Sequence, residues 1–308
     1  MRPGSRYLRD AMRSTPPVPF LAVVLLGCSA APPRVMVEDE ARAAAPIPAC
    51  VLRLPPRKPE SKGLARTLRE EQYWQLVYPT FSSEDSTLPN GAVDCVGIDV
   101  FKTTAFSGTK PVRSPLKIEE GDIMFGAGAD RLKIVWLRSH RGEDGVVAGA
   151  IALVRTLETE AEVYAVGTYK GVPAATRFGI ERIGPNVLVT SIEDGCRGRK
   201  PNTPCESRVT VNLVYSGRLV PVTEVITERV VYASDSEPGF PGRVEYHMTS
   251  GVEFSAKGLR VLEQIRVSDV NGAPLRKLEL DRMMVLDGAK PMKATAESLW
   301  GRLQLKKS

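Results

Sequence analysis

The sequence predicts a mainly β protein whose strands form an antiparallel meander, closed into a barrel or folded into a sandwich. From residue 130 onward, stretches with apolar residues at alternate positions are separated by turn residues every 10–15 positions. Asn271-Gly272, a dipeptide typical of tight hairpin turns, joins two of these stretches. Helices of the kind that connect parallel strands are not indicated between them, which argues against a dinucleotide-binding α/β fold.

The expected strands follow from this alternation. Val209, Val211 and Leu213 share one face of a strand, and Val244, Tyr246 and Met248 share one face of another. Residues 139–145 are polar and glycine-containing, so they are expected to form a turn. The expected strands are 131–138, 149–157, 161–169, 176–183, 187–192, 208–215, 219–232, 244–248, 259–267 and 275–286.

Short helices are expected near both ends of this domain. Residues 62–72 place Leu64, Ala65 and Leu68 at helical spacing, with Ser61 as the cap. The aromatic and β-branched residues 73–78, which stop at Pro79, predict a strand or a core anchor. Residues 81–121 are rich in Ser, Thr, Pro, Gly and Asp and predict a long irregular region, and residues 295–303 predict a short C-terminal helix.

The N-terminal segment has the pattern of a secretory signal peptide. Four arginines at positions 2, 6, 9 and 13 precede the apolar run 18–26, which is too short to cross a membrane. Met12 and Arg13 before the same run would also make a sufficient start. We therefore expect residues 1–27 to be a signal peptide and the protein to be exported.

The end of this segment, Leu25-Leu26-Gly27-Cys28, resembles the lipobox of bacterial lipoproteins. The resemblance covers residues 18–28 and implies cleavage before Cys28, attachment of a diacylglycerol to its thiol and membrane anchoring through several acyl chains. Ser29 and Ala30 lack the aspartate that often retains such proteins in the inner membrane. In a cell with two membranes, the outer membrane is the expected location. The alternative is an ordinary signal peptide with a chance cysteine.

Residues 28–60 predict a tether. They are rich in alanine and contain prolines at positions 32, 33, 46, 48, 55, 56 and 59, so this segment is expected to be extended and semi-rigid. The expected globular domain is 61–308, with an irregular flank at 61–125 and antiparallel strands from 130 to the end.

Charge argues against a nucleic-acid partner. The signal segment 1–27 holds four of the 42 basic and one of the 36 acidic residues, which leaves a near-balanced 38 against 35. No cluster of lysine and arginine with interleaved aromatic residues is present. The expected partners are the membrane, through the lipid at Cys28, and another envelope protein or a polysaccharide.

The four remaining cysteines predict two disulfides, since an even number in an exported chain is typical of structural bridges. Cys196 and Cys205 would close a ten-residue loop, and Cys50 with Cys95 would tie the tether to the domain. Paired close spacings, which zinc sites need, do not occur. Arg197, Arg199 and Lys200 in the ten-residue loop are candidate contacts for anionic headgroups or polysaccharide, although a solvated, disulfide-closed loop is the favoured interpretation.

Catalytic motifs are weak. His140 falls in the expected turn, and His247 shares a strand face with Glu245. Ser114 and Lys117 match the Ser-x-x-Lys pair of penicillin-recognising enzymes, but Pro115 precedes a strand-like stretch and that family's other motifs are missing. The glycines from Gly126 begin a phosphate-loop pattern that no helix follows.

Metal chemistry is likewise weakly indicated. The acidic residues Glu84, Asp85, Asp94 and Asp99 gather near Cys95 without the spacing of a calcium loop. We therefore expect no cofactor, no metal site and no catalytic residue. The leading hypothesis is a lipid-anchored, non-enzymatic envelope protein with a binding or structural role. The alternatives are a carrier with an apolar cavity inside a barrel, and a hydrolase that uses Asp or Ser with one of the histidines.

Overall fold

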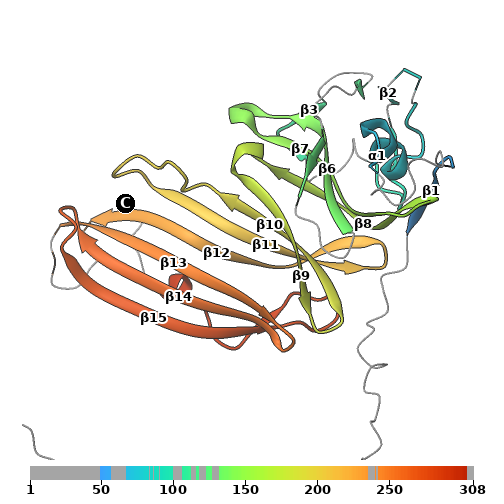
Figure 1. The fold of residues 1–308 in the computed structure, drawn as a ribbon. Coiled ribbons are helices and arrows are strands. Elements are labelled where there is room, and N and C mark those ends of the chain that lie inside the picture. The colour runs from blue at the N-terminus through green and yellow to red at the C-terminus, as the bar shows by residue number, and fades with distance from the viewer. Residues whose placement is uncertain are drawn as a thin grey trace, which may run out of the picture. The chain divides into compact units, whose positions relative to one another are not determined.

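The structure is a computed structural model whose contacts divide the chain into two units, residues 1–39 and 40–308. It describes residues 49–56, 67–82, 84–85, 87–89, 91–99, 106–111, 116–117, 123–126, 132–234, 240 and 242–303. The first unit, with the predicted signal peptide and Cys28, lies outside the described residues, as does the tether up to residue 48. The described part of the second unit is mainly β, as predicted (Figure 1).

Three long strands form the first part of the main sheet. β6 (Leu132–Arg141), β7 (Val147–Thr156) and β8 (Glu160–Gly171) pair antiparallel in chain order, with the 3-10 helix η3 (Glu143–Gly145) after β6.

Short strands extend this part. β1 (Cys50–Arg53) pairs with β8, and both β3 (Lys110–Pro111) and β5 (Ile123–Phe125) pair with β6. β2 (Thr87–Leu88) and β4 (Leu116–Lys117) pair with each other in a separate sheet. The described parts of the predicted irregular flank therefore contain only short strands and one helix.

The second part is a meander in which each strand is antiparallel to the next. After the 3-10 helix η4 (Pro173–Ala175), its strands are β9 (Thr176–Ile183), β10 (Asn186–Asp194), β11 (Cys205–Tyr215), β12 (Arg218–Ser234), β13 (Arg243–Ser255), β14 (Gly258–Asp269), β15 (Pro274–Val285) and β16 (Lys293–Ala294). Among the described strands, β9 and β16 each pair with a single neighbour. The meander is therefore open, and the barrel alternative is wrong.

One long strand links the two parts of the sheet. β12 pairs with β11 over residues 218–230 and with β13 over residues 228–234. Arg218 at the start of β12 also pairs in parallel with Val166 of β8. This parallel contact joins the eight-stranded meander to the strands before it.

The strands stack in layers with apolar clusters between them. Both faces of β7 and of β10 are buried over most of their length, as expected for strands inside a layered structure. Trp136, Phe178 and Val189 belong to a cluster that joins β6–β8 to β9 and β10. Leu188 and Val261 belong to another, which joins β9–β12 to β14 and β15. This packing matches the sandwich alternative.

The N-terminal helix lies further along the chain than predicted. α1 spans Glu70–Val77, so the strand alternative for 73–78 is wrong and these residues anchor the core instead, while residues 62–66 of the expected helix lie outside the described residues. Glu70 and Glu71 occupy the first turn, where acidic side chains favour a helix start. The buried aromatic residues of α1 belong to the same apolar cluster as three alanines of β7, Ala148, Ala150 and Ala152, whose small side chains leave room for them.

The C-terminal segment covers the inner face of β13–β15. α2 (Leu299–Arg302) is shorter than the predicted helix at 295–303, and Leu299 packs in one cluster with Tyr246 and Ile265. The buried carboxylate of Glu263 holds the segment. It accepts a hydrogen bond from the Leu299 backbone nitrogen at 2.6 Å and pairs with the Arg282 guanidinium at 2.7 Å. This face of the meander is therefore covered by the protein's own C-terminal segment.

Most predicted strands are confirmed to within a few residues, and 176–183 matches β9 at both ends. The largest differences are that β13 runs on to Ser255 and β6 runs on to Arg141. The expected turn at 139–145 is therefore wrong in its first part. β6 continues past a bulge at Ser139, because Lys110 and Pro111 of β3 pair with its last residues.

Candidate functional site

A polar cleft of about 310 Å³ lies where the two parts of the sheet meet. We call it the interlayer cleft. Its walls come from β7 and β8 on one side and from β10, β11 and β12 on the other. The polar residues that line it are Thr168, Tyr169, Lys170, Ser191, Glu193, Arg208, Thr210, Asn212 and Glu224, and the apolar ones are Ile151, Leu219 and Pro221.

Strand register brings the polar side chains together. Ser191 of β10 lies opposite Thr210 of β11, and Thr210 lies opposite Glu224 of β12. Val187 and Val189 precede Ser191 on the same face of β10 and are buried in the apolar cluster with Trp136. The strand face thus changes from apolar to polar along its length, and the space between the layers changes from packed core to open cleft.

The approach of β8 to β12 depends on a glycine. A Cβ atom placed on Gly167 would lie 2.8 Å from the Cβ atom of Leu219, closer than side chains approach one another. Leu219 lines the interlayer cleft, so the missing side chain at residue 167 sets the distance between its two walls.

Tyr169 forms the aromatic part of the wall. Its ring makes edge-to-face contacts with Trp136 and Phe178, at centroid distances of 5.1 Å to each. Its hydroxyl lies 3.3 Å from the Thr176 hydroxyl. Burial is the main cause that raises the pKa of Tyr169, so the phenol is neutral and can both donate and accept a hydrogen bond.

The charged side chains of the cleft are already paired. The Arg208 guanidinium lies 2.7 Å from Glu206, 3.4 Å from Glu224 and 3.8 Å from Glu193. Glu193 is its direct cross-strand neighbour, a placement that favours opposite charges. Lys170 donates to the backbone carbonyl of Ser107 at 2.7 Å. The cleft therefore contains both signs of charge close together.

Ser191 stands out among the lining residues. It is only 2 % exposed, and among the described residues its hydroxyl has no hydrogen-bond partner of good geometry, although it neighbours the Tyr169 phenol. A buried hydroxyl without a partner costs about 1–3 kcal/mol. Its position in the wall of an open cleft is where a bound group could supply the missing partner.

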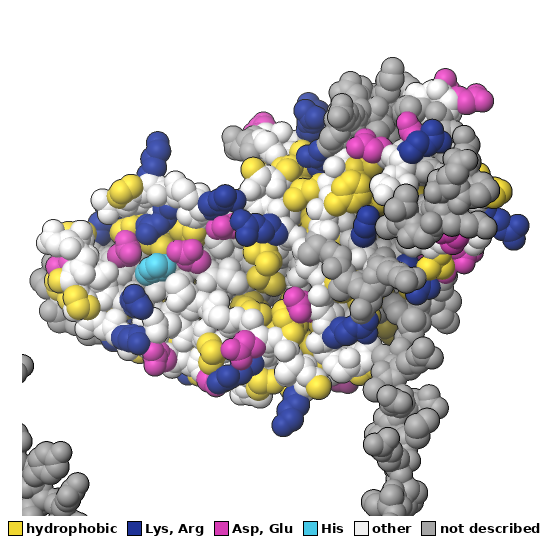
Figure 2. All heavy atoms as spheres, viewed as in Figure 1, with side chains coloured by type: hydrophobic (Ala, Val, Ile, Leu, Met, Phe, Trp, Pro, Cys, Tyr) yellow, Lys and Arg dark blue, Asp and Glu magenta, His cyan; other side chains and the backbone are white. Residues whose placement is uncertain are grey.

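A second hollow, about 490 Å³, lies elsewhere, over β13–β15 near Leu262 and Gln264. Its polar side chains contact one another, as Gln264 does with Glu279 at 2.9 Å, and Arg260 pairs with Asp281 at 2.7 Å. Figure 2 shows basic and acidic side chains interspersed over the face that it draws. We interpret this hollow as part of a solvated sheet face, since charged pairs cover it.

The two histidines lie apart from the cleft and from each other. His140 was expected in a polar turn, but it is buried in β6, with its Nδ1 atom 2.8 Å from the Ser139 hydroxyl and its ring against Phe106. Burial lowers the pKa of His140 to about 4, so the ring is neutral.

His247 lies in β13, as expected, and contacts Glu228 of the neighbouring strand at 3.0 Å. Glu245, which shares its strand face, accepts instead from the Tyr232 hydroxyl at 2.6 Å. The two residues of the predicted pair therefore have different partners.

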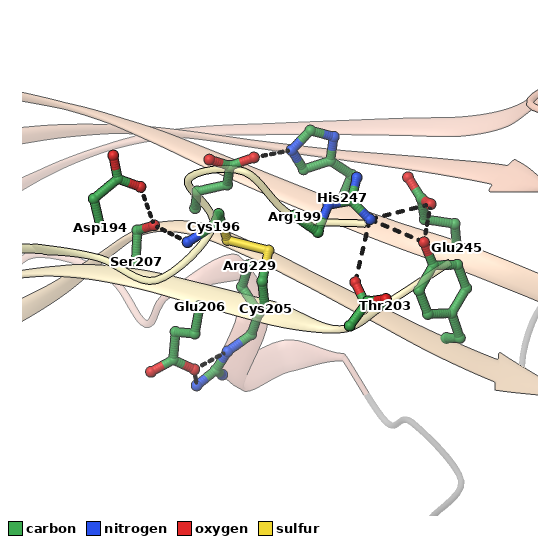
Figure 3. The surroundings of a disulfide bond; sticks show 12 residues. Asp194, Cys196, Arg199, Thr203, Cys205, Glu206, Ser207, Arg229, Glu245 and His247 are labelled. Atoms are coloured by element: carbon green, nitrogen blue, oxygen red, sulfur yellow. Dashed lines mark hydrogen bonds and ion pairs between the residues drawn. A yellow bond between two sulfur atoms is a disulfide. The ribbon is translucent and has the colours of Figure 1, made fainter. Parts of the chain in front are cut away.

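Both predicted disulfides are confirmed: Cys50 pairs with Cys95 and Cys196 with Cys205. The loop closed by the second one folds against β12 and β13 (Figure 3). There Arg199 donates to the Tyr232 hydroxyl at 3.0 Å and to the Thr203 carbonyl at 3.3 Å. Arg199 is thus engaged within the protein, whereas Arg197 and Lys200 are exposed.

The remaining sequence candidates do not form a site within the described residues. Asp94 is buried and accepts from the backbone nitrogens of Val96 at 3.0 Å and Ile98 at 2.8 Å, whereas Glu84 and Asp85 are exposed. Ser114 and residues 127–130, which follow Gly126, lie outside the described residues. Where side chains are described, no group of three or more His, Cys, Asp or Glu could hold a metal ion.

Comparisons with known proteins add no relative. No family model, no curated protein and no solved structure matches this chain. Among the described residues, no helix is both long enough and apolar enough to span a membrane.

Sequence reasoning missed the residues of the interlayer cleft. Thr210 and Asn212 alternate with apolar residues on their strand, a pattern that indicates a solvent-facing side. The available signal was the apolar run from Val187 to Val189 before Ser191, since consecutive apolar residues indicate burial on both faces of a strand. That signal marks an inner layer but does not say which other strands lie beside it.

Proposed function

We propose that the mature chain is a lipid-anchored envelope protein with a non-enzymatic binding role, and that the interlayer cleft is its binding site. Two features support anchoring and export: the lipobox-like ending at Cys28, and two disulfides, which persist in oxidising compartments outside the cytoplasm. The observation that carries the binding role is the buried Ser191 hydroxyl, which lacks a partner in the wall of an open, polar cleft.

The positions of the reactive side chains favour binding over catalysis. His140 is enclosed beneath Phe106, and the contacts of His247 lie on the sheet face beside the disulfide loop. Neither histidine lines the interlayer cleft. Glu193 and Glu224 do line it, but both contact the same arginine, whereas a carboxyl that acts as general acid is typically held in apolar surroundings. The cleft thus has groups that can hold a ligand and lacks a paired nucleophile and base.

The packing of the meander argues against the carrier alternative. The strands that would form the cavity wall turn their apolar residues toward one another and toward Leu299 of α2. An acyl chain would have to displace the C-terminal segment, which the Glu263 carboxylate holds through Leu299 and Ser298. We therefore place the binding site in the interlayer cleft and not inside the meander.

The anchoring part of the proposal is tested at Cys28. In the native host, the wild-type protein is expected in the membrane fraction, with an acylated N-terminal peptide that begins at Cys28 in its mass spectrum, and Cys28→Ser is expected to lose the acyl group. A wild-type protein whose Cys28 carries no acyl group would overturn the anchoring proposal.

The binding part is tested by filling the cleft in a host strain in which deletion of the chain has a measurable effect. Thr210→Trp is expected to fold and to be anchored, yet to fail to complement the deletion, because the indole occupies the cleft. Gln264→Trp, on the strand face of the larger hollow, is the matched control and is expected to complement. Full complementation by a folded Thr210→Trp protein would mean that the cleft is not the binding site.

A further inference from the structure

We infer that the interlayer cleft takes a neutral, hydroxyl-rich ligand of the saccharide class, an inference that rests on the binding role proposed above. The cleft combines three features that suit a saccharide: many uncharged hydrogen-bonding groups, an aromatic and aliphatic surface, and charged side chains that pair with one another. Each feature argues against a different class of ligand.

The charges argue against an anionic ligand. Arg208 is the central cation of the cleft, and three carboxylates, Glu193, Glu206 and Glu224, contact its guanidinium. A phosphate or carboxylate that approached Arg208 would also approach these three acidic groups. Like charges at such distances repel, so the site disfavours anions despite its two basic residues.

The uncharged polar groups suit hydroxyls. Thr168, Ser191 and Thr210 each carry a hydroxyl that can donate one hydrogen bond and accept others. The Asn212 amide nitrogen donates to the Val189 carbonyl at 3.4 Å, which fixes the orientation of the amide in the wall. A sugar hydroxyl has the same dual capacity, and it can serve the buried Ser191 oxygen without bringing a charge into the cleft.

The apolar part of the lining suits the carbon skeleton of a sugar ring. Tyr169 is held in place by Trp136 and Phe178, and Ile151, Leu219 and Pro221 complete an apolar surface beside the polar groups. Ligand sites commonly combine such an apolar wall with a few oriented polar groups. A volume of about 310 Å³ lies at the lower end of the usual range for ligand pockets, which fits a mono- or disaccharide unit.

The experiment is calorimetric titration of the purified mature chain. The probes are cellobiose, maltose and N,N′-diacetylchitobiose as neutral disaccharides, inorganic phosphate as the anion, and decanoate as the acyl chain. We expect one or more of the disaccharides to bind and the other two probes not to bind.

Ser191→Ala is the decisive variant. It is expected to weaken disaccharide binding about five- to tenfold, the usual effect of one lost hydrogen bond. The thermal midpoint should stay the same or rise, because the variant removes a buried hydroxyl that has no partner. Ser207→Ala is the matched control. That hydroxyl donates to Asp194 and accepts from the Cys196 nitrogen, so its loss should lower the midpoint and leave the affinity unchanged.

The outcomes separate this inference from the proposed function. Binding of phosphate or decanoate alone, weakened by Thr210→Trp, would overturn the saccharide class and leave the cleft as a binding site. Disaccharide binding that Ser191→Ala and Thr210→Trp leave unchanged would place the saccharide elsewhere and overturn the inference. If no probe binds, the saccharide class is overturned, and the complementation by Thr210→Trp decides independently whether the cleft functions at all.

Discussion

The guanidinium of Arg218 lies 3.7 Å from the carboxylate of Asp94 and also donates to the backbone carbonyl of Val96. Arg218 begins β12, and Asp94 precedes Cys95, which is bonded to Cys50 of β1. Three distant parts of the chain therefore meet here: β1, the residues around Cys95 and the start of the longest strand of the meander.

This junction predicts that Asp94 contributes strongly to the stability of the folded protein. Asp94→Ala removes a buried carboxylate that accepts from two backbone nitrogens, so we expect the free energy of unfolding to fall by about 2 kcal/mol. Urea denaturation followed by circular dichroism measures the change. Asp85→Ala removes an exposed carboxylate in the same flank and should leave the midpoint where it is. Equal midpoints for the two variants would contradict the structural role of Asp94.

His140 predicts a loss of stability in acid. Its pKa is lowered by burial from 6.5 to about 4, so the unfolded chain binds a proton at a higher pH than the folded protein does. Stability from this residue is complete above pH 6.5 and is lost as the pH falls toward 4. The loss should be about 2 kcal/mol at pH 5.

The measurement for His140 is urea denaturation at several pH values between 4 and 8. His140→Asn keeps a hydrogen-bonding atom near the position of Nδ1 but does not titrate. The free energy of unfolding of the wild type, relative to that of this variant, should therefore decrease as the pH is lowered from 8 to 4. Parallel pH profiles for the two proteins would show that His140 is not buried in its neutral form.

The two disulfides should differ in their contributions to stability. In the chain-entropy account, the bridge between Cys196 and Cys205 contributes about 3 kcal/mol, and the longer loop between Cys50 and Cys95 about 4 kcal/mol. Paired serine variants test this by urea denaturation. Since Arg199 still joins the shorter loop to Tyr232 of β12 and to Thr203 within the loop, loss of the disulfide between Cys196 and Cys205 should be the better tolerated of the two. A larger loss from the 196/205 variant than from the 50/95 variant would contradict this order.

The buried carboxylate of Glu263 is predicted to hold the C-terminal segment in place. Glu263→Gln leaves the Arg282 guanidinium buried without its charge partner, which typically costs about 3–5 kcal/mol. Hydrogen exchange should accelerate at Leu299, whose backbone nitrogen donates to this carboxylate. Glu279→Gln alters an exposed carboxylate on β15 and serves as the control. Unchanged protection of α2 in the Glu263 variant would show that the apolar contacts of Leu299 suffice to hold it.

The fold class and most strands were predictable, because alternation is a local property and β11 carries it from Val209 to Leu213. The helix α1 was not, since Tyr73, Trp74 and Val77 individually favour strands, whereas the cluster in which they pack as a helix includes alanines of β7 that lie far away in the sequence. His140 was misplaced for a similar reason. The sequence Ser-His-Arg has the polarity of a turn, and the ring that covers His140, Phe106, comes from another part of the chain.

The candidate site was the least predictable feature. Its residues come from five strands, and each is an ordinary polar position on its own strand. What makes Ser191 unusual is the layer that faces it, which depends on the contact between Gly167 and Leu219. Contacts of this kind depend on tertiary packing and leave no periodic pattern in the sequence.

The disulfide at Cys50 has a mechanical consequence for a protein held at Cys28. Tension along the tether would reach the described domain at Ala49 and Cys50, where β1 pairs with β8 through only four residues. Hydrogen bonds loaded from one end of so short a strand would open one after another. The bond from Cys50 to Cys95 diverts the load into the flank, and Asp94 and Arg218 pass it on to β12. A covalent crosslink thus reinforces the domain at the residue where a force from a membrane anchor at Cys28 would first act on it.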